Sequence, residues 1–129
     1  MTPTDETTVA FIAEIGETSR YLAARNDLYA SVMIAQAILE SDSGQSQLSQ
    51  KPLYNFFGIK GEYNGQSVTL PTWEDDGKGN PYHIDAAFRS YGSVENSLQD
   101  YVEFLEGSYY VGVHRSKTRS YKDATAALT

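Results

Sequence analysis

Apolar residues recur along the first part of the chain with the spacing of an amphipathic α-helix. The stripe that carries this pattern consists of Val9, Ile12, Ile15 and Leu22. It predicts a helix from about Asp5 to Ala24, with Gly16 as a weak point. Asn26 and Asp27 then interrupt the pattern, and their side chains are of the type that caps the start of a following helix.

The next segment has apolar residues on every side of a helix drawn through it. Residues 28–39 carry no charge, and Ser41-Asp-Ser-Gly44 supplies a helix-ending sequence. Helices that are apolar all round are normally buried. The first charge after this run is Glu40, in the last turn. The pattern therefore predicts a buried helix that holds one carboxyl group at its carboxyl end.

Three effects at this position favour the protonated form of Glu40. These are removal from water, the negative end of the helix dipole, and the nearby carboxylate of Asp42. A carboxylic acid that stays protonated near neutral pH is what general acid catalysis requires. The alternative is a glutamate that simply reaches solvent from a helix end, which is the commoner situation for this residue type.

The hydrophobic period changes to two after a polar, irregular stretch over residues 45–52 and an aromatic, glycine-containing stretch over residues 54–61. Alternation over residues 66–91 predicts a β-hairpin with a mobile, turn-rich tip from Asp75 to Pro81. Ser93 then begins a helix, and a last short helix is expected near Ser120. Helices beside one small hairpin predict a single α+β domain.

Composition narrows the possible functions. The chain has 129 residues, a net charge of -7 and no cysteine. The acidic balance argues against nucleic-acid binding, since phosphate contacts need a basic surface. No apolar run is long enough for a membrane span, and neither disulfides nor thiolate chemistry are available. His83 and His114 lack acidic partners at metal-ligand spacing, so they are interpreted as surface residues and no metal is predicted.

Five blocks occur in one order and give the chain a family resemblance. They are Ala35-Gln-Ala-Ile-Leu-Glu-Ser41 with Gly44, Leu48-Ser49, Asn55-Phe-Phe-Gly-Ile-Lys-Gly61, Thr72-Trp-Glu74 and Phe88-Arg-Ser-Tyr91. The sequence resembles the glucosaminidase domain of bacterial autolysins, glycoside hydrolase family 73. The resemblance runs from about residue 8 to the end of the chain. Each block is weak alone, but five with compatible spacing are specific.

The resemblance implies a lysozyme-like fold with a groove between a mainly helical lobe and a small hairpin lobe. It implies hydrolysis of the β-1,4 bond after N-acetylglucosamine in peptidoglycan glycan strands, with no cofactor. Glu40 matches the family's general acid, and Glu74 matches its second acidic residue. We expect a monomeric module of a larger exported protein, secreted to the cell wall, although the polar first residues contain no signal peptide.

Four further residues are candidates for substrate binding. Asn55 is able to hydrogen-bond a sugar acetamide or to fix its own loop, and the loop role is slightly favoured. Phe57 belongs either to the core or to the floor of the groove. Trp73 offers a flat ring of the kind that stacks on sugars. Tyr91 either orients substrate or packs at the base of the hairpin.

Two departures from the family pattern affect these expectations. Ser43 stands where the family often has tryptophan, so packing or a sugar subsite beside Glu40 is expected to differ. Family members also usually continue past the equivalent of Thr129 into a closing segment, so this chain is expected to lack that segment.

Two other functions remain open at this stage. One is a non-catalytic module that binds wall glycan. The other is a muramidase or lytic transglycosylase that acts on the neighbouring bond. Inversion or retention at the anomeric carbon is also undecided, because water activated by Glu74 gives inversion and attack by the substrate's own N-acetyl group gives retention.

Overall fold

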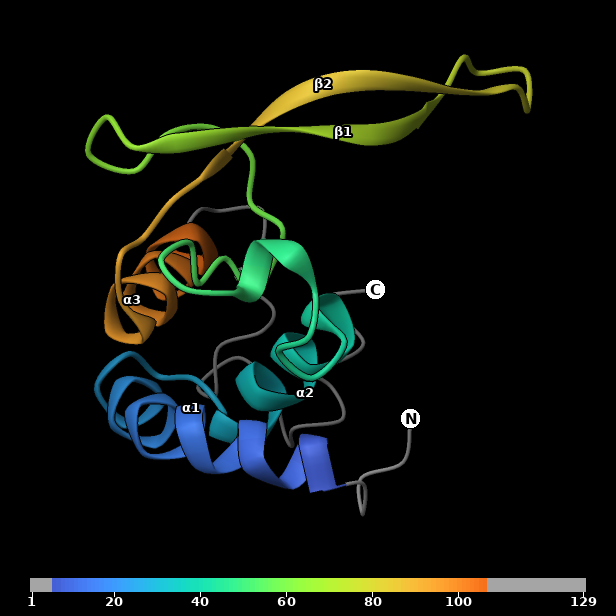
Figure 1. The fold of residues 1–129 in the computed structure, drawn as a ribbon. Helices are drawn as coiled ribbons and strands as arrows, with labels where there is room; N and C mark the ends of the chain where they lie inside the picture. The colour runs from blue at the N-terminus through green and yellow to red at the C-terminus, as the bar shows by residue number, and fades with distance from the viewer. Residues whose placement is uncertain (1–5, 107–129) are drawn as a thin grey trace.

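The computed structural model describes residues 6–106, which form a helical lobe and a projecting hairpin (Figure 1). The elements in chain order are α1 (Glu6–Arg25), α2 (Ala30–Ser41), a short 3₁₀ helix (Gln47–Ser49), β1 (Ser67–Asp75), β2 (Pro81–Arg89) and α3 (Val94–Leu105). The predicted α+β class is therefore confirmed. The helix expected near Ser120 and the surface position expected for His114 lie outside the described residues.

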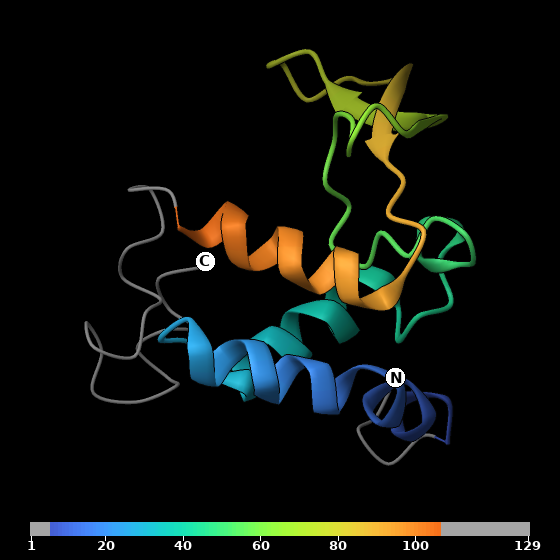
Figure 2. The same cartoon turned by 90° about the vertical axis from the view of Figure 1, so that its left-hand side faces the viewer.

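The helical lobe contains the hydrophobic core. Helix α1 packs against both α2 and α3, and Figure 2 shows the three helices side by side beneath the hairpin. Phe56 follows the 3₁₀ helix and enters this core, where its ring meets the Phe11 ring edge-on at 5.3 Å between centroids. The segment that leads to the hairpin is thus anchored in the same core as the helices.

Helix α2 differs from its prediction in its cap and in its burial. Its N-cap residue is Tyr29, which makes no side-chain capping bond, while Asn26 donates to the Leu22 carbonyl at the end of α1 instead. Only one face of α2 is covered by the core, and Leu39 is 74% exposed. Although the segment carries no charge, α2 lies at the surface of the lobe. The prediction that it is buried on all sides was wrong.

The hairpin forms as predicted. Strands β1 and β2 pair antiparallel from Ser67 with Arg89 to Asp75 with Pro81. Even-numbered residues of β1 are half-buried and odd-numbered ones are exposed, which is the alternation expected of a strand with one covered face. Two backbone bonds, from Gly61 to the Ala87 carbonyl and from Arg89 to the Ile59 carbonyl, attach the incoming segment to β2.

The hairpin tip is closed by side-chain to backbone hydrogen bonds. Asp75 accepts from the backbone of Gly77 and Gly79, and Asp76 accepts from Lys78 and Asn80. Aspartates that bond to the backbone two residues later are typical of tight turns. The expected mobility of this tip stays a prediction, but any motion has to break these bonds or carry the tip as a unit.

Within residues 6–106, none of the helices has the length and apolar character that crossing a membrane requires.

Candidate active site

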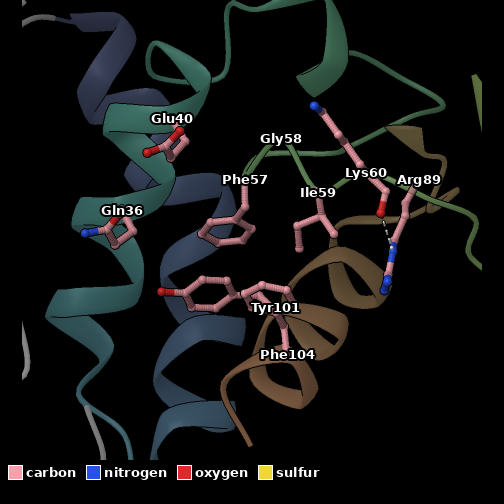
Figure 3. A pocket seen from close by; sticks show the side chains of 9 residues that line it. All are labelled: Gln36, Glu40, Phe57, Gly58, Ile59, Lys60, Arg89, Tyr101 and Phe104. Atoms are coloured by element: carbon pink, nitrogen blue, oxygen red, sulfur yellow. Dashed lines mark hydrogen bonds between the residues drawn. The ribbon is translucent and has the colours of Figure 1, made fainter. Parts of the chain in front are cut away.

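A pocket of about 520 Å³ opens between α2, α3 and the segment that leads to the hairpin (Figure 3). Its residues come from four separate parts of the chain. They are Gln36 and Glu40 of α2, Phe57, Gly58, Ile59 and Lys60 of the connecting segment, Arg89 at the end of β2, and Tyr101 and Phe104 of α3. The helical lobe and the base of the hairpin therefore share one concave site that contains a single carboxyl group.

Glu40 is positioned by the tight turn that follows it. The Ser41 hydroxyl donates to the Ala37 carbonyl and accepts from the Gly44 backbone, and Ser43 shares a 2.8 Å hydrogen bond with Thr8 of α1. Ser43 is buried, so the tryptophan that the family often has here is replaced by a small residue bonded to α1. These contacts fix the end of α2 and, with it, the backbone of Glu40.

The side chain of Glu40 is exposed, which differs from the desolvated position predicted from the apolar run. The reason is the one-sided burial of α2, since Glu40 projects from the face that the core leaves open. Its carboxyl group makes no hydrogen bond or ion pair with any other part of residues 6–106. Solvent has access to the carboxyl group until a ligand fills the pocket.

Phe57 and Tyr101 form the aromatic wall of the pocket. Their rings are stacked at 3.9 Å between centroids with only 13° between their planes. Figure 3 shows this pair across the pocket from Glu40 and Gln36. Phe57 thus lines the pocket, in agreement with its predicted place on the groove floor, and it does so because α3 supplies a second ring behind it.

An ion pair with Lys60 connects Glu74 to the wall of the pocket. The Lys60 ammonium donates to Glu74 Oε1 at 2.7 Å, and 33% of the Glu74 side chain is exposed. Lys60 itself lines the pocket, whereas Glu74 is not among the lining residues. The second acidic residue therefore lies on the covered face of the hairpin and is tied to the pocket wall by an ion pair.

Trp73 lies on the opposite face of the hairpin from Glu74. Consecutive strand residues point to opposite faces, and Trp73 is 64% exposed with its ring 3.6 Å from that of His83. Trp73 therefore does not share the face of the hairpin that carries Glu74, and its contact with a sugar stays a prediction. His83, predicted to be a surface residue, is indeed exposed.

Asn55 has a structural role. It is buried, its amide nitrogen donates to the carbonyls of Ile59 and Arg89 at 2.9 Å each, and its oxygen accepts from the Ile59 backbone. These bonds occupy both amide hydrogens and hold the loop against the end of β2. The bonds are those expected of the loop-fixing alternative, and contact of Asn55 with substrate stays a prediction.

Tyr91 is also buried, at the base of the hairpin. Its hydroxyl donates to the Asp100 carboxylate at 2.5 Å, and Arg89 donates to the same oxygen at 2.8 Å. Burial, reinforced by the hydrogen bond to Asp100, raises the pKa of the Tyr91 phenol well above its ordinary value. Tyr91 therefore packs at the base of the hairpin, as the second alternative expected, and its contact with substrate stays a prediction.

Sequence reasoning missed several residues that line the pocket. Gln36 stands four residues before Glu40, a spacing that puts both on one helix face. Lys60 and Arg89 belong to the blocks that carried the family resemblance, but neither was singled out. Tyr101 lies in the helix predicted after Ser93, and nothing in the sequence indicated that its ring would stack on Phe57.

Comparisons with known proteins place this geometry in a family. Residues 16–129 match the glucosaminidase family, described as mannosyl-glycoprotein endo-beta-N-acetylglucosaminidase. An autolysin of Enterococcus faecalis is 49% identical over 92% of the chain, and a probable N-acetylmuramidase of Lactococcus lactis is 48% identical over 93%. The chain spans only 17% and 29% of those two proteins. The catalytic domain of a Listeria monocytogenes autolysin superposes on the whole chain, and 76% of that domain is covered, with a TM-score of 0.90 and 46% identity.

Proposed function

The chain belongs to the glucosaminidase family, and on that basis we propose that it is the catalytic domain of a cell-wall glycosidase that cleaves the β-1,4 bond after N-acetylglucosamine in peptidoglycan. The single observation that carries this proposal is the position of Glu40. It is the only carboxyl group among the residues that line the pocket, and none of the described residues hydrogen-bonds to it.

Glu40 acts as the general acid. Its carboxyl group protonates the glycosidic oxygen while the bond from that oxygen to the anomeric carbon breaks, which leaves an oxocarbenium-like sugar. The proton must be present at the start of the reaction, so the carboxyl group has to be protonated in the complex. A glycan that fills the pocket removes water from Glu40 and favours the protonated form. The substrate thus provides the desolvation that the free domain lacks.

Glu74 serves as the second carboxylate. Its ion pair with Lys60 holds the Glu74 side chain on the covered face of the hairpin, where a carboxylate stabilises the positive charge that develops at the anomeric carbon. Two routes complete the reaction. Either Glu74 activates a water molecule, or the N-acetyl group of the substrate attacks first and Glu74 assists the later entry of water.

The neighbouring bond is the principal competing site of cleavage. The Lactococcus relatives are named as probable N-acetylmuramidases, whereas a Bacillus subtilis relative, 37% identical over 92% of the chain, is named as an exo-glucosaminidase. The Asn55-Phe-Phe-Gly-Ile-Lys-Gly61 block of the resemblance supports the glucosaminidase assignment.

Analysis of the ends released from purified peptidoglycan tests the proposal. New reducing ends on N-acetylglucosamine are expected. Reducing ends on N-acetylmuramic acid would indicate a muramidase, and anhydro ends would indicate a lytic transglycosylase. Binding to peptidoglycan without any new ends would indicate a non-catalytic module.

The domain is proposed to act outside the cell as one module of a larger exported protein. The small share of each relative that it spans supports a modular arrangement, and the autolysin relatives support a location at the wall.

A further inference from the structure

The pocket contains a second polar side chain without a partner. Lys60 is paired with Glu74, and Arg89 bonds to Asp100 and to the Lys60 carbonyl. The Gln36 amide, by contrast, makes no hydrogen bond with any of residues 6–106. Gln36 is half-buried in the pocket wall, so its donor and acceptor groups are available to a ligand.

Gln36 and Glu40 lie on one face of α2, one turn apart (Figure 3). Residues four apart on a helix are separated by about 6 Å along its axis. A group that contacts Gln36 while Glu40 contacts the glycosidic oxygen must therefore lie close to the bond that is cleaved. On a sugar, the substituent nearest the anomeric carbon is the one on C2.

The chemistry of the amide matches one substituent in particular. An acetamide has one N–H donor and one carbonyl acceptor, and a glutamine side chain has the complementary carbonyl and NH₂ groups. Phe57, with the Tyr101 ring stacked against it, lies across the pocket from α2 and offers an apolar surface for the acetyl methyl group.

We propose that Gln36 is the residue that selects a 2-acetamido sugar on the non-reducing side of the bond that is cleaved, by hydrogen bonding its acetamide against the Phe57–Tyr101 wall. This inference rests on the proposed function. It predicts that removal of the acetyl group from the glucosamine weakens catalysis, because the Gln36 amide is then left unpaired in the occupied pocket.

The test compares two substrates: peptidoglycan, and the same peptidoglycan after an enzyme has removed the acetyl groups from its glucosamine residues. Wild type is expected to prefer the acetylated form in kcat/KM by at least about tenfold, because loss of the acetyl group removes one hydrogen-bonded pair and, on the route in which the N-acetyl group attacks, the nucleophile as well. Gln36→Met keeps the length of the side chain and its helix propensity but removes both polar groups, so the preference should fall by about tenfold relative to wild type. Any preference that remains measures participation of the acetyl group in the reaction.

Gln36→Glu supplies a second, independent readout. It replaces the amide with a carboxylate, whose negative charge attracts the free ammonium group on C2 of the de-N-acetylated sugar. This variant should shift the preference toward the de-N-acetylated glycan, an outcome that a purely structural role for Gln36 would not produce. Gln99→Met is the matched control, because Gln99 is exposed on α3 and does not line the pocket; its preference should equal that of wild type.

The outcomes separate the two proposals. If wild type releases no reducing ends, the proposed function fails and the inference falls with it. If wild type is active but Gln36→Met and Gln36→Glu keep the wild-type preference, the inference alone is overturned. The inference is also overturned if Gln36→Met loses kcat/KM equally on the acetylated and the de-N-acetylated substrate while Gln36→Glu keeps the wild-type preference between them.

Discussion

Lys60 and Glu74 form a 2.7 Å ion pair that links the wall of the pocket to the covered face of the hairpin. The two residues come from different blocks of the sequence, and neither block alone indicates the contact. Through this pair, Lys60, which lines the pocket, positions Glu74, the second carboxylate of the proposed mechanism. It also gives the hairpin a defined position relative to Glu40 without burying either charge.

Lys60→Met should therefore lower activity more than stability. An exposed ion pair contributes about 0–1 kcal/mol, so the melting temperature should change little, and wall lysis at low salt should slow by up to about fivefold. Lys60→Arg should restore part of the rate, and added salt should narrow the gap between wild type and Lys60→Met, because it screens the pair. A Lys60→Met rate equal to wild type at low salt would show that the contact does not position Glu74.

Tyr91→Phe tests the buried network at the base of the hairpin. The pKa of Tyr91 is raised by burial first and then by the hydrogen bond to Asp100. A group with a raised folded pKa contributes stability that is complete below its unfolded pKa, about 10 for tyrosine, and is lost as the pH rises above that value. The variant should lose about 1–3 kcal/mol at neutral pH and show a flatter decline of stability above pH ~10.

Urea unfolding at a series of alkaline pH values measures this difference. Tyr21→Phe is the control, because Tyr21 is 59% exposed and its loss should leave the slope unchanged. If the free energy of unfolding fell equally steeply with pH above pH ~10 in wild type and in Tyr91→Phe, the predicted link between Tyr91 ionisation and stability would be contradicted.

Gly44→Ala should disturb the turn that positions Glu40. Gly44 has a φ of +79°, and a Cβ atom there would lie 2.6 Å from Cδ1 of Phe11. Strain of the backbone and overlap with the ring should together cost about 2–4 kcal/mol. Gly65→Ala separates the two contributions, because Gly65 has the same φ and its added Cβ would meet nothing within 4 Å. Equal losses of unfolding free energy in the two variants would show that the Phe11 contact is unimportant.

Asn55→Ala should destabilise the segment that carries Phe57 and Lys60. It removes three hydrogen bonds from a buried site and leaves the Ile59 backbone without its partner, a loss of about 2–4 kcal/mol. Thermal unfolding measures the loss. If stability were unchanged while glycan affinity fell, Asn55 would be a ligand-binding residue after all.

The sequence was sufficient to predict elements whose pattern is local. The helix near residues 5–24, the hairpin over residues 66–91 and the helix that begins at Ser93 depend on period and turn chemistry, and all three are confirmed. The Ser93 side chain accepts from the Asn96 backbone, as an N-cap residue should. The family resemblance supplied what periodicity cannot, namely which glutamates to consider.

Properties that depend on tertiary contacts were predicted less well. The charge-free segment before Glu40 was interpreted as a buried helix, but burial depends on which neighbours cover it, and the core covers only one side of α2. Tyr91 and Trp73 were both candidates for substrate binding, with packing at the base of the hairpin as the alternative for Tyr91. The pairing register and the Asp100 carboxylate, which lies on α3, place one under the hairpin and the other on its outer face.

The rate of glycan hydrolysis by Glu40→Gln is the most direct test of the account. Glutamine preserves the size of the side chain but has no proton to give to the glycosidic oxygen, so release of reducing ends should fall by about 10² to 10⁴. Melting temperature and peptidoglycan binding should stay near wild type, because Glu40 is exposed and makes no contact that holds the fold together. Glu14→Gln, on the exposed side of α1, should retain full activity. Wild-type turnover in Glu40→Gln would contradict the assignment of the general acid and, with it, the proposed mechanism.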